Sequence, residues 1–314
     1  MSRIIVAGAG AFGTALALAI ERPLTLTARN MGAMIATRRS PRLPDVELPD
    51  HIALDPAPRI GPDDILLLAI PMQALSGYLE GLVGTPKAAI ACCKGIELDT
   101  ARGPTDVLAG ALDCPSAILT GPSFATDISQ GKPTALTLAC ADPEMGAALQ
   151  QALSSDTLRL YLSDDPTGAE LGGALKNVIA IACGICMGAG LGESARAALM
   201  TRGMAETNRL ALKLGASPET LQGLAGFGDL ALTCTSPQSR NYSFGFALGA
   251  GTTPPEGKTV EGRATAQATL KLAAKHGVDM PVTKVVAGLV SGQITMPQAL
   301  DALLSRPLKS EQED

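Results

Sequence analysis

The chain has no tryptophan, and aromatic residues make up only 3% of its 314 residues. Without large rings, a core must be filled mainly by aliphatic and small side chains. Alanine and the 34 glycines supply much of the apolar content, which indicates helices that pack closely backbone to backbone. The composition is that of a soluble globular protein, and the length allows two domains, each with its own core.

A positive charge excess and a hydrophobic leader are also missing. The formal net charge of −5 gives no electrostatic reason to bind nucleic acid or an anionic membrane, so an anionic ligand needs locally concentrated positive charge. The first residues enter an apolar stretch at once, without the basic region of a signal peptide. The most apolar later window, 178–191, is too short and glycine-rich for a membrane span. We therefore expect a cytoplasmic protein without membrane insertion.

The cysteines do not describe a disulfide framework, because they number seven and are irregularly spaced. Cys183 and Cys186 form a C-x-x-C, but they lie in an apolar run where buried packing is favoured over a redox pair. Cys92 and Cys93 are typical of the end of a buried strand. No cluster of histidine, cysteine and carboxylate residues has ligand spacing, so no metal site is predicted.

Histidine is scarce, since only His51 and His276 are present and neither lies in a recognisable motif. A proton-transfer group is better sought in the run 168–182, which places Lys176 in an otherwise apolar, small-residue segment. A buried lysine is costly unless it is paired or able to lose its proton, and burial lowers its pKa toward the range of a general acid/base. The alternative is a helix lysine whose ammonium group reaches the surface.

The first half of the chain alternates short apolar runs with helical stretches. A helix is predicted over 11–20, and Pro71 stands where a helix would begin. Nearly continuous apolar strands that alternate with helices favour a parallel sheet covered on both faces. The predicted strands are 3–7, 24–27, 65–69, 88–91, 117–120 and 134–139.

From about Asp165 the pattern changes to long helices. Ser217 and Met296 are typical of helix starts, and the polar tail 309–314 is expected to fray. The acidic, proline-containing segment 163–167 predicts a boundary between an α/β domain, residues 1–164, and an α-helical domain, residues 165–314. The predicted helices are 168–188, 194–214, 263–276, 283–291 and 296–304.

The sequence Gly8-Ala-Gly10-Ala-Phe-Gly13 is a G-x-G-x-x-G between the first predicted strand and the first predicted helix. In this context the pattern is typical of a dinucleotide-binding turn. Its glycines let a pyrophosphate approach the backbone, and the N-terminus of the helix attracts phosphate. A chance glycine turn is the alternative.

Arg29 stands at the end of the second predicted strand, where an aspartate or glutamate would bind the ribose 2′-hydroxyl of NAD. An arginine can pair with a 2′-phosphate, and no carboxylate lies nearby to repel one. We therefore expect NADP(H) to be accepted at least as well as NAD(H). A solvated surface arginine is the alternative.

Further polar clusters follow the later strands and the predicted helices. Lys94 and the segment 121–125 come directly after neighbouring strands, at the edge where α/β sheets bind ligands. In the second domain, Asp229 and the sequence Ser239-Arg240-Asn241 flank a predicted turn. Alone, Asp229 fits a helix cap and Arg240 a solvated side chain, although the planar guanidinium group suits bidentate phosphate binding.

Taken together, the motifs of this chain occur in a specific order that spans nearly its whole length and includes the closing Leu-Ser-Arg-Pro-Leu. The ordered set resembles the bacterial NAD(P)-dependent glycerol-3-phosphate dehydrogenase family. The small departures are Phe12, where the family often has tryptophan or tyrosine, and a short link at 21–23. The motifs are Gly8–Gly13 followed by Thr-Ala-Leu-Ala, Cys-Lys94-Gly-Ile-Glu, Gly121-Pro-Ser-Phe-Ala, Leu171-Gly-Gly-Ala-Leu-Lys176-Asn177, Gly226-Phe-Gly-Asp229-Leu, Ser239-Arg240-Asn241 and Gly257-Lys-Thr-Val260-Glu261-Gly262.

The resemblance implies a Rossmann-like N-terminal domain and a mostly α-helical C-terminal domain like that of 6-phosphogluconate dehydrogenase. It implies reversible hydride transfer between NADPH or NADH and dihydroxyacetone phosphate, giving sn-glycerol 3-phosphate for phospholipid synthesis, in a homodimer. By resemblance, Lys176 is the general acid/base, supported by Asp229 and Thr233. The substrate-binding positions are Lys94, Gly121, Ser123, Asn177, Ser239, Arg240 and Asn241. The cofactor positions are Gly8, Gly10, Ala11, Phe12, Gly13, Arg29, Lys94, Ala125, Arg240, Val260 and Glu261.

Two other interpretations stay open at this point. A related β-hydroxyacid or sugar-acid dehydrogenase shares the two-domain plan and a Lys-Asn pair on a helix, and it would act on a hydroxyacid instead. A non-catalytic NAD(P)H-binding sensor would bind cofactor without turnover and would not need Lys176, Asp229 and Arg240 together.

Overall fold

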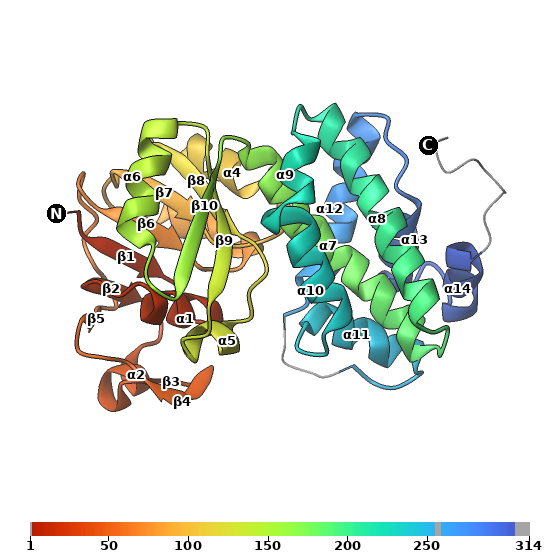
Figure 1. The fold of residues 1–314 in the computed structure, drawn as a ribbon, viewed down its shortest axis with the longest axis horizontal. Helices are drawn as coiled ribbons and strands as arrows, with labels where there is room; N and C mark the ends of the chain where they lie inside the picture. The colour runs from red at the N-terminus through yellow and green to blue at the C-terminus, as the bar shows by residue number, and fades with distance from the viewer. Residues whose placement is uncertain (1, 255–258, 305–314) are drawn as a thin grey trace.

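The computed structural model describes residues 2–254 and 259–304, and it has two parts that lie side by side (Figure 1). We call residues 2–164 the sheet part and residues 165–304 the helical part. All described strands end by Ser163, and the first long helix begins at Pro166. We therefore propose that the boundary between the two domains lies after residue 164, as the sequence predicts. The predicted tail at 309–314, the closing motif beyond residue 304 and Gly257 lie outside the described residues.

The sheet part is built on an eight-stranded sheet of order β10-β9-β8-β7-β6-β1-β2-β5, with a separate β3–β4 pair. Its strands are β1 (Ile4–Ala7), β2 (Leu24–Thr27), β3 (Arg39–Ser40), β4 (Leu43–Glu47), β5 (Ile52–Leu54), β6 (Ile65–Leu68), β7 (Ala88–Ala91), β8 (Ser116–Thr120), β9 (Thr134–Cys140) and β10 (Leu158–Ser163). Its helices are α1 (Ala11–Ala19), α2 (Gly32–Thr37), the 3₁₀ turn η1 (Met72–Ala74), α3 (Leu75–Glu80), α4 (Pro104–Ala111), α5 (Ala125–Ser129) and α6 (Pro143–Leu153).

Helices cover both faces of this sheet, as predicted. Alternate residues of β1 point to opposite faces, so Ile4 and Val6 pack with α1, α5 and α6. Ile5 and Ala7 pack with α3 and α4 on the other face. The sheet is parallel from β5 to β8, as predicted, but β9 runs antiparallel to β8 and β10 follows the direction of β9. The connection between β8 and β9 carries the short helix α5 against α1 and does not cross the sheet.

Some smaller expectations also need correction. Pro71 immediately precedes η1 and is not the first residue of a helix. The edge strand β10 was missed by a search for continuous apolar runs, although its alternation of buried and exposed residues is the pattern of a half-exposed strand. The short edge strand β5 and the β3–β4 pair likewise lack a continuous buried run.

The strands that matter for the site end at one edge. Since β1, β6, β7 and β8 are neighbours and parallel, Gly8, Lys94 and Gly121 follow strands that end on the same side. Only β6 separates β1 from β7, so the ends of these two strands lie about 10 Å apart. A ligand held at Gly8 is therefore within reach of Lys94.

The helical part is organised around one central helix, α7. Its helices are α7 (Pro166–Gly188), α8 (Glu193–Lys213), α9 (Pro218–Gln222), the π-helical turn η2 (Leu224–Gly228), α10 (Asp229–Thr235), α11 (Arg240–Gly249), α12 (Glu261–Lys275), α13 (Pro281–Val290) and α14 (Met296–Leu304). The long helices match their predicted ranges to within two residues, and α11 was not predicted. Asp165 caps α7, because its carboxylate accepts the Gly168 N–H at 2.8 Å.

Every residue of α7 from Gly168 to Cys186 is buried. Within the described residues, α7 is long and apolar enough to cross a membrane, with a mean hydropathy of 1.6, but 89% of that window is buried inside the protein. It packs against α8, α10, α11, α12 and α13. The apolar surface of α7 is thus explained by its place in the core of the helical part.

Glycines on α7 and α11 let these two helices touch backbone to backbone. A Cβ added at Gly184 of α7 would lie 2.1 Å from the Tyr242 carbonyl oxygen, and one added at Gly245 of α11 would lie 2.1 Å from the Ile181 carbonyl oxygen. Gly188 and Gly249 make the same kind of contact one turn further on. This close approach fixes the start of α11 beside the middle of α7.

We expect Gly184→Ala to lower the free energy of unfolding by at least about 2 kcal/mol, because the added methyl group must push two packed backbones apart. Gly77→Ala is the matched control. Gly77 is an exposed residue of α3 with open space around it, so the better helix propensity of alanine should stabilise the protein by up to about 1 kcal/mol. Denaturant unfolding measures both values. Equal free energies of unfolding for Gly184→Ala and the wild type would contradict the close backbone contact between α7 and α11.

Candidate active site

The position of Asp229 beside Lys176 follows from small residues on two elements. Gly172 lies one turn before Lys176 on α7, and a Cβ there would be 2.6 Å from the Ala225 carbonyl oxygen. That Cβ would also be 2.9 Å from the Gly226 Cα, so η2 lies tightly against α7, and a Cβ at Gly226 itself would be 2.0 Å from the Leu221 carbonyl oxygen of α9. The turn η2 leads directly into α10, whose first residue is Asp229. The carboxylate therefore meets the lysine of the next turn of α7.

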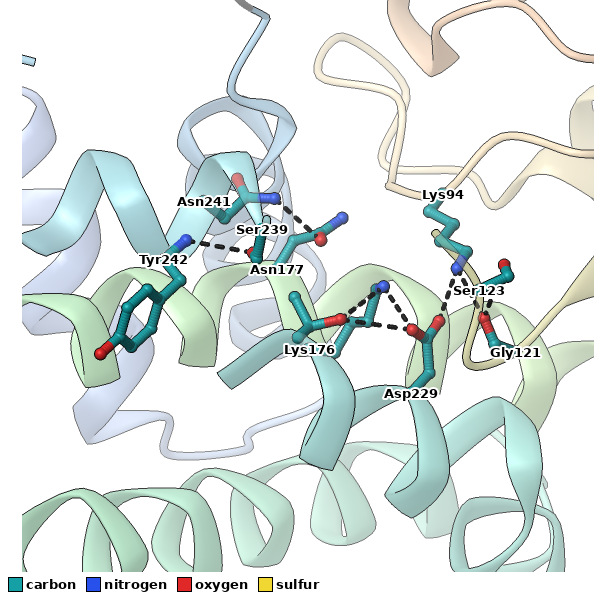
Figure 2. Close-up of polar contacts among 10 residues, drawn as sticks. Lys94, Gly121, Ser123, Lys176, Asn177, Asp229, Ser239, Asn241 and Tyr242 are labelled. Atoms are coloured by element: carbon teal, nitrogen blue, oxygen red, sulfur yellow. Dashed lines mark hydrogen bonds and ion pairs between the residues drawn. The ribbon is translucent and has the colours of Figure 1, made fainter. Parts of the chain in front are cut away.

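Asp229 bridges two lysines that come from different parts of the molecule (Figure 2). The Lys176 ammonium donates to Asp229 Oδ1 at 2.5 Å and to Thr233 Oγ1 at 2.8 Å. From the sheet part, the Lys94 ammonium donates to Asp229 Oδ2 at 2.5 Å and to the Gly121 carbonyl oxygen at 3.1 Å. Asp229 is 0% exposed. Ser123 closes the sheet side of the site, since its hydroxyl donates to the Gly121 carbonyl oxygen at 3.3 Å.

Burial of Lys176 is confirmed, and the alternative of a surface lysine is wrong. The lysine is 7% exposed, and burial is the main cause that lowers its pKa to about 8. The charge of Asp229 opposes this shift, while Lys94 adds to it. One carboxylate faces two ammonium groups, so the site carries an excess of positive charge that suits an anionic ligand.

A second polar group lies on the same face of α7. The Asn241 side chain donates from Nδ2 to Asn177 Oδ1 at 2.9 Å, and Asn241 Oδ1 accepts the Gly262 N–H at 3.0 Å. The Ser239 hydroxyl accepts the Tyr242 N–H at 3.2 Å and so caps α11. Arg240, the first residue of α11, is exposed. The predicted Ser-Arg-Asn sequence thus places one arginine at the rim and one asparagine against α7.

Glu261 interacts electrostatically with Arg240 and with both lysines of the site. It is the first residue of α12, directly after Val260, and it is partly buried. Burial raises the pKa of the Glu261 carboxyl, and the nearby charges of Arg240, Lys94 and Lys176 oppose that shift. The charges of Arg240 and Lys176 in the helical part and of Lys94 in the sheet part therefore all act on the Glu261 carboxyl.

The glycine turn has the shape that a dinucleotide requires. Gly8 has φ +112°, and a Cβ there would be 2.3 Å from the Ala69 carbonyl oxygen. A Cβ at Gly13 would be 1.9 Å from the Gly8 carbonyl oxygen, so neither position accepts a side chain. Gly10 has open space around it and offers no side-chain cap to α1. The start of α1 therefore has no side-chain cap and no crowding at Gly10, as expected of a turn that binds a pyrophosphate.

Four other predicted cofactor residues lie on elements next to this turn. Ala11 and Phe12 begin α1 and are partly buried. Ala125 begins α5, which packs against α1. Arg29 is exposed and follows β2, the strand next to β1.

The pair Cys183 and Cys186 lies inside the helical part. Cys183 and Cys186 are buried, and burial raises the pKa of the Cys186 thiol to about 11, which makes it unreactive. In the part of the chain that the structure describes, no group of three or more histidine, cysteine, aspartate or glutamate residues could hold a metal ion.

The sequence analysis missed one buried charge close to the site. Glu170 lies on α7 in the same apolar run as Lys176 and is 8% exposed. The signal that singled out Lys176, a charge within an apolar helix, applied equally to Glu170. It also missed that Asp229 pairs with Lys94, since nothing local relates residues 135 positions apart.

Comparisons with known proteins agree on one family. A family model of the N-terminus of NAD-dependent glycerol-3-phosphate dehydrogenase matches residues 3–146, and a model of its C-terminus matches residues 165–301. The NAD(P)+ glycerol-3-phosphate dehydrogenase of Cereibacter sphaeroides is 56% identical over 311 residues, which cover 98% of this chain and 99% of that protein. The corresponding protein of Paracoccus denitrificans is 52% identical over 315 residues, with 98% and 99% covered. The crystal structure of glycerol-3-phosphate dehydrogenase from Coxiella burnetii is similar with a TM-score of 0.89 and 34% identity, covering 97% of this chain and 99% of that one.

Replacing Asp229 by asparagine removes the carboxylate that favours the charged form of Lys176. Because burial and Lys94 still disfavour that form, we expect the pKa of Lys176 to fall below about 8. An NMR titration of the lysine side chains measures the change. Asp279→Asn, which removes the exposed partner of Lys284, is the control and should leave Lys176 unaffected. A Lys176 pKa that rises or stays constant in Asp229→Asn would contradict the assigned pairing.

Proposed function

The chain belongs to the NAD-dependent glycerol-3-phosphate dehydrogenase family, and we propose that Lys176 is the general acid/base with which it interconverts dihydroxyacetone phosphate and sn-glycerol 3-phosphate. The enzyme is an NAD(P)-dependent oxidoreductase. The observation that carries the proposal is a pair of ion pairs that share Asp229, one with Lys94 of the sheet part and one with Lys176 of the helical part. They join the two parts of the molecule in one site. Family membership favours this reaction over a β-hydroxyacid dehydrogenase or a non-catalytic sensor.

In the reduction, the protonated Lys176 stabilises the negative charge that develops on the ketone oxygen and donates the proton to it. When bound, the nicotinamide cofactor supplies the hydride. Asp229 and Thr233 hold the ammonium group from one side, which leaves its remaining hydrogen for the substrate oxygen. In the oxidation, the neutral amine accepts the proton. A pKa of about 8 allows both directions near neutral pH.

Binding the phosphate is the proposed role of the positive charge at the rim. We assign the phosphate to Arg240 and Asn241, because an exposed guanidinium group beside an amide gives several donors at the start of a helix. A fixed phosphate orients the ketone toward Lys176, and its binding energy lowers the entropic cost of reaction. Lys94, Gly121, Ser123, Asn177 and Ser239 complete the proposed substrate site.

For the cofactor, we propose that the turn from Gly8 to Gly13, with Ala11 and Phe12, holds the pyrophosphate. The nicotinamide end would be held by Lys94 and Ala125 of the sheet part and by Arg240, Val260 and Glu261 of the helical part. Arg29 lies at the adenosine end, where it suits a 2′-phosphate. The open space at Gly10 and the uncapped start of α1 support this assignment.

We further propose that the enzyme is cytoplasmic, forms a homodimer and provides the sn-glycerol 3-phosphate from which glycerophospholipids are made. The reaction product supports the link to lipid synthesis.

Lys176→Ala should reduce kcat for NADPH oxidation with dihydroxyacetone phosphate at least about 100-fold, since the proton donor is lost. The dissociation constant for NADPH should stay within about threefold, because the glycine turn is untouched and Lys94 still pairs with Asp229. Lys284→Ala, at an exposed lysine of α13, is the control and should keep full activity. A near-normal kcat in Lys176→Ala would overturn the acid/base assignment.

The pH dependence of the two directions should be opposite. Reduction needs the charged lysine, so kcat/KM for dihydroxyacetone phosphate should fall as the pH rises through about 8. Oxidation of sn-glycerol 3-phosphate needs the neutral amine and should rise over the same range. Initial rates at saturating cofactor between pH 6.5 and 9.5, a window of about 1.5 pH units on either side of the transition, measure both profiles. Parallel profiles in the two directions would contradict the assignment.

The cofactor prediction tests Arg29. The wild type should use NADPH with a kcat/KM at least equal to that for NADH, and Arg29→Ala should lower only the value for NADPH, by about tenfold. Arg22→Ala is the control, because Arg22 is exposed and donates to the Gln151 carbonyl oxygen away from the glycine turn. A strong preference of the wild type for NADH would count against this role of Arg29.

A further inference from the structure

Lys94 begins a segment that lies between the sheet part and the helical part. We call residues 94–103 the Lys94 segment; it starts after β7 and ends at the first turn of α4. From the sheet part, Gln73 holds its middle, because Gln73 Nε2 donates to the Ile96 carbonyl oxygen at 2.8 Å and Gln73 Oε1 accepts the Leu98 N–H at 3.0 Å. From the helical part, the Lys271 ammonium donates to the Leu98 carbonyl oxygen at 3.0 Å.

The far end of the segment is held by Glu170. The Thr105 N–H, in the first turn of α4, donates to Glu170 Oε1 at 2.5 Å in a buried contact. A Cβ added at Gly103 would lie 2.0 Å from Glu170 Oε2, so the carboxylate lies directly on the backbone there. Gly103 is the N-cap of α4 and has no side chain to cap it. Glu170 therefore supplies the cap of α4 from another helix.

Both ends of the Lys94 segment are thus tied to α7. At one end, Lys94 shares Asp229 with Lys176, and at the other, Thr105 binds Glu170. Glu170 and Lys176 are six residues apart on one rigid helix, which corresponds to about 9 Å along its axis. The position of Lys94 relative to Lys176 therefore depends on the contact that Glu170 makes.

We propose that Glu170 is a positioning residue for Lys94: by fixing the end of the Lys94 segment on α7, it sets Lys94 in place for the substrate. The inference rests on the proposed substrate-binding role of Lys94. Glu170 acts through the segment, so its loss should weaken substrate binding more than it slows the chemical step, for which Lys176, Asp229 and Thr233 remain in place.

The contact should also respond to pH. The pKa of the Glu170 carboxyl is raised to about 7, mainly by burial and to a smaller extent by Asp106 of α4 and Asp165 at the start of α7, while the bonds from Thr105 oppose the rise. Cys93, at the end of β7, also faces Glu170, but burial holds its pKa well above the usual range, so it stays a neutral thiol. As the pH falls through about 7, Glu170 becomes protonated and caps α4 less strongly. The KM for dihydroxyacetone phosphate should then rise in the wild type.

The experiment measures steady-state kinetics of dihydroxyacetone phosphate reduction with NADPH in four single variants and one double variant. Glu170→Ala should raise KM for the substrate about tenfold and change kcat less than about threefold. Glu170→Gln keeps an acceptor oxygen but no charge, so its KM should lie between those of the wild type and Glu170→Ala. Its KM should also lack the rise below pH 7 that the wild type shows. If Glu170→Ala fails to fold, Glu170→Gln and its pH profile decide the question.

Glu206 offers a matched control. It is a buried carboxylate on α8 that caps α13, accepting the Val282 N–H at 2.5 Å and the Thr283 N–H at 3.2 Å. Glu206→Gln removes the charge of an equivalent helix cap away from the Lys94 segment. It should lower the melting temperature without changing KM or its pH dependence, which separates a positioning effect from a general loss of stability.

A double variant with Lys94→Ala tests the route of the effect. If Glu170 acts through Lys94, Glu170→Ala should add little to the KM of Lys94→Ala. If Lys94→Ala raises KM and neither Glu170 variant does, the inference is overturned and the proposed function stands. If Lys94→Ala leaves KM unchanged, the substrate-binding role of Lys94 fails and the inference fails with it. Independent, additive effects, or a wild-type pH profile in Glu170→Gln, would also overturn the inference.

Discussion

The site depends on a single buried carboxylate that compensates two ammonium groups. Asp229 accepts from Lys94 of the sheet part and from Lys176 of the helical part, each at 2.5 Å. Within the described residues Asp229 is the direct ion-pair partner of both lysines, while Glu261 acts on them only through the longer-range interaction of its charge. A buried charge group of this kind adds little net stability, because the cost of desolvation offsets the attraction. What it provides is a defined arrangement of a proton donor and an anion-binding group.

Small residues make that arrangement possible. Gly172 and Gly226 let the turn before Asp229 lie against α7, and the glycines of α7 and α11 bring Asn241 beside Asn177. The lack of tryptophan and the low aromatic content agree with this construction, since large rings would hold the backbones further apart. The same helices that form the core therefore also fix the distances within the site.

Local patterns were enough to predict the dinucleotide turn, most strands of the sheet and the long helices, because each rests on periodicity or on glycines in a defined context. The apolar neighbours of Lys176 left a buried and a surface lysine open, and only the full set of motifs favoured the buried one that the structure has. The direction of β9, the partnership of Asp229 with Lys94 and the contact of Glu170 with Thr105 could not be predicted. These features arise when segments far apart in the chain pack together, and no local pattern encodes that packing.

The buried position of α7 has a consequence for synthesis of the protein. This helix is complete at Gly188, but α11 begins only at Arg240 and α13 ends at Val290. A nascent chain that has left the ribosome up to α7 therefore carries an apolar helix of membrane-like hydropathy before the segments that cover it have been translated. Until about a hundred further residues emerge, which takes about 5–20 s at usual elongation rates, this helix is a binding site for chaperones and a nucleus for aggregation.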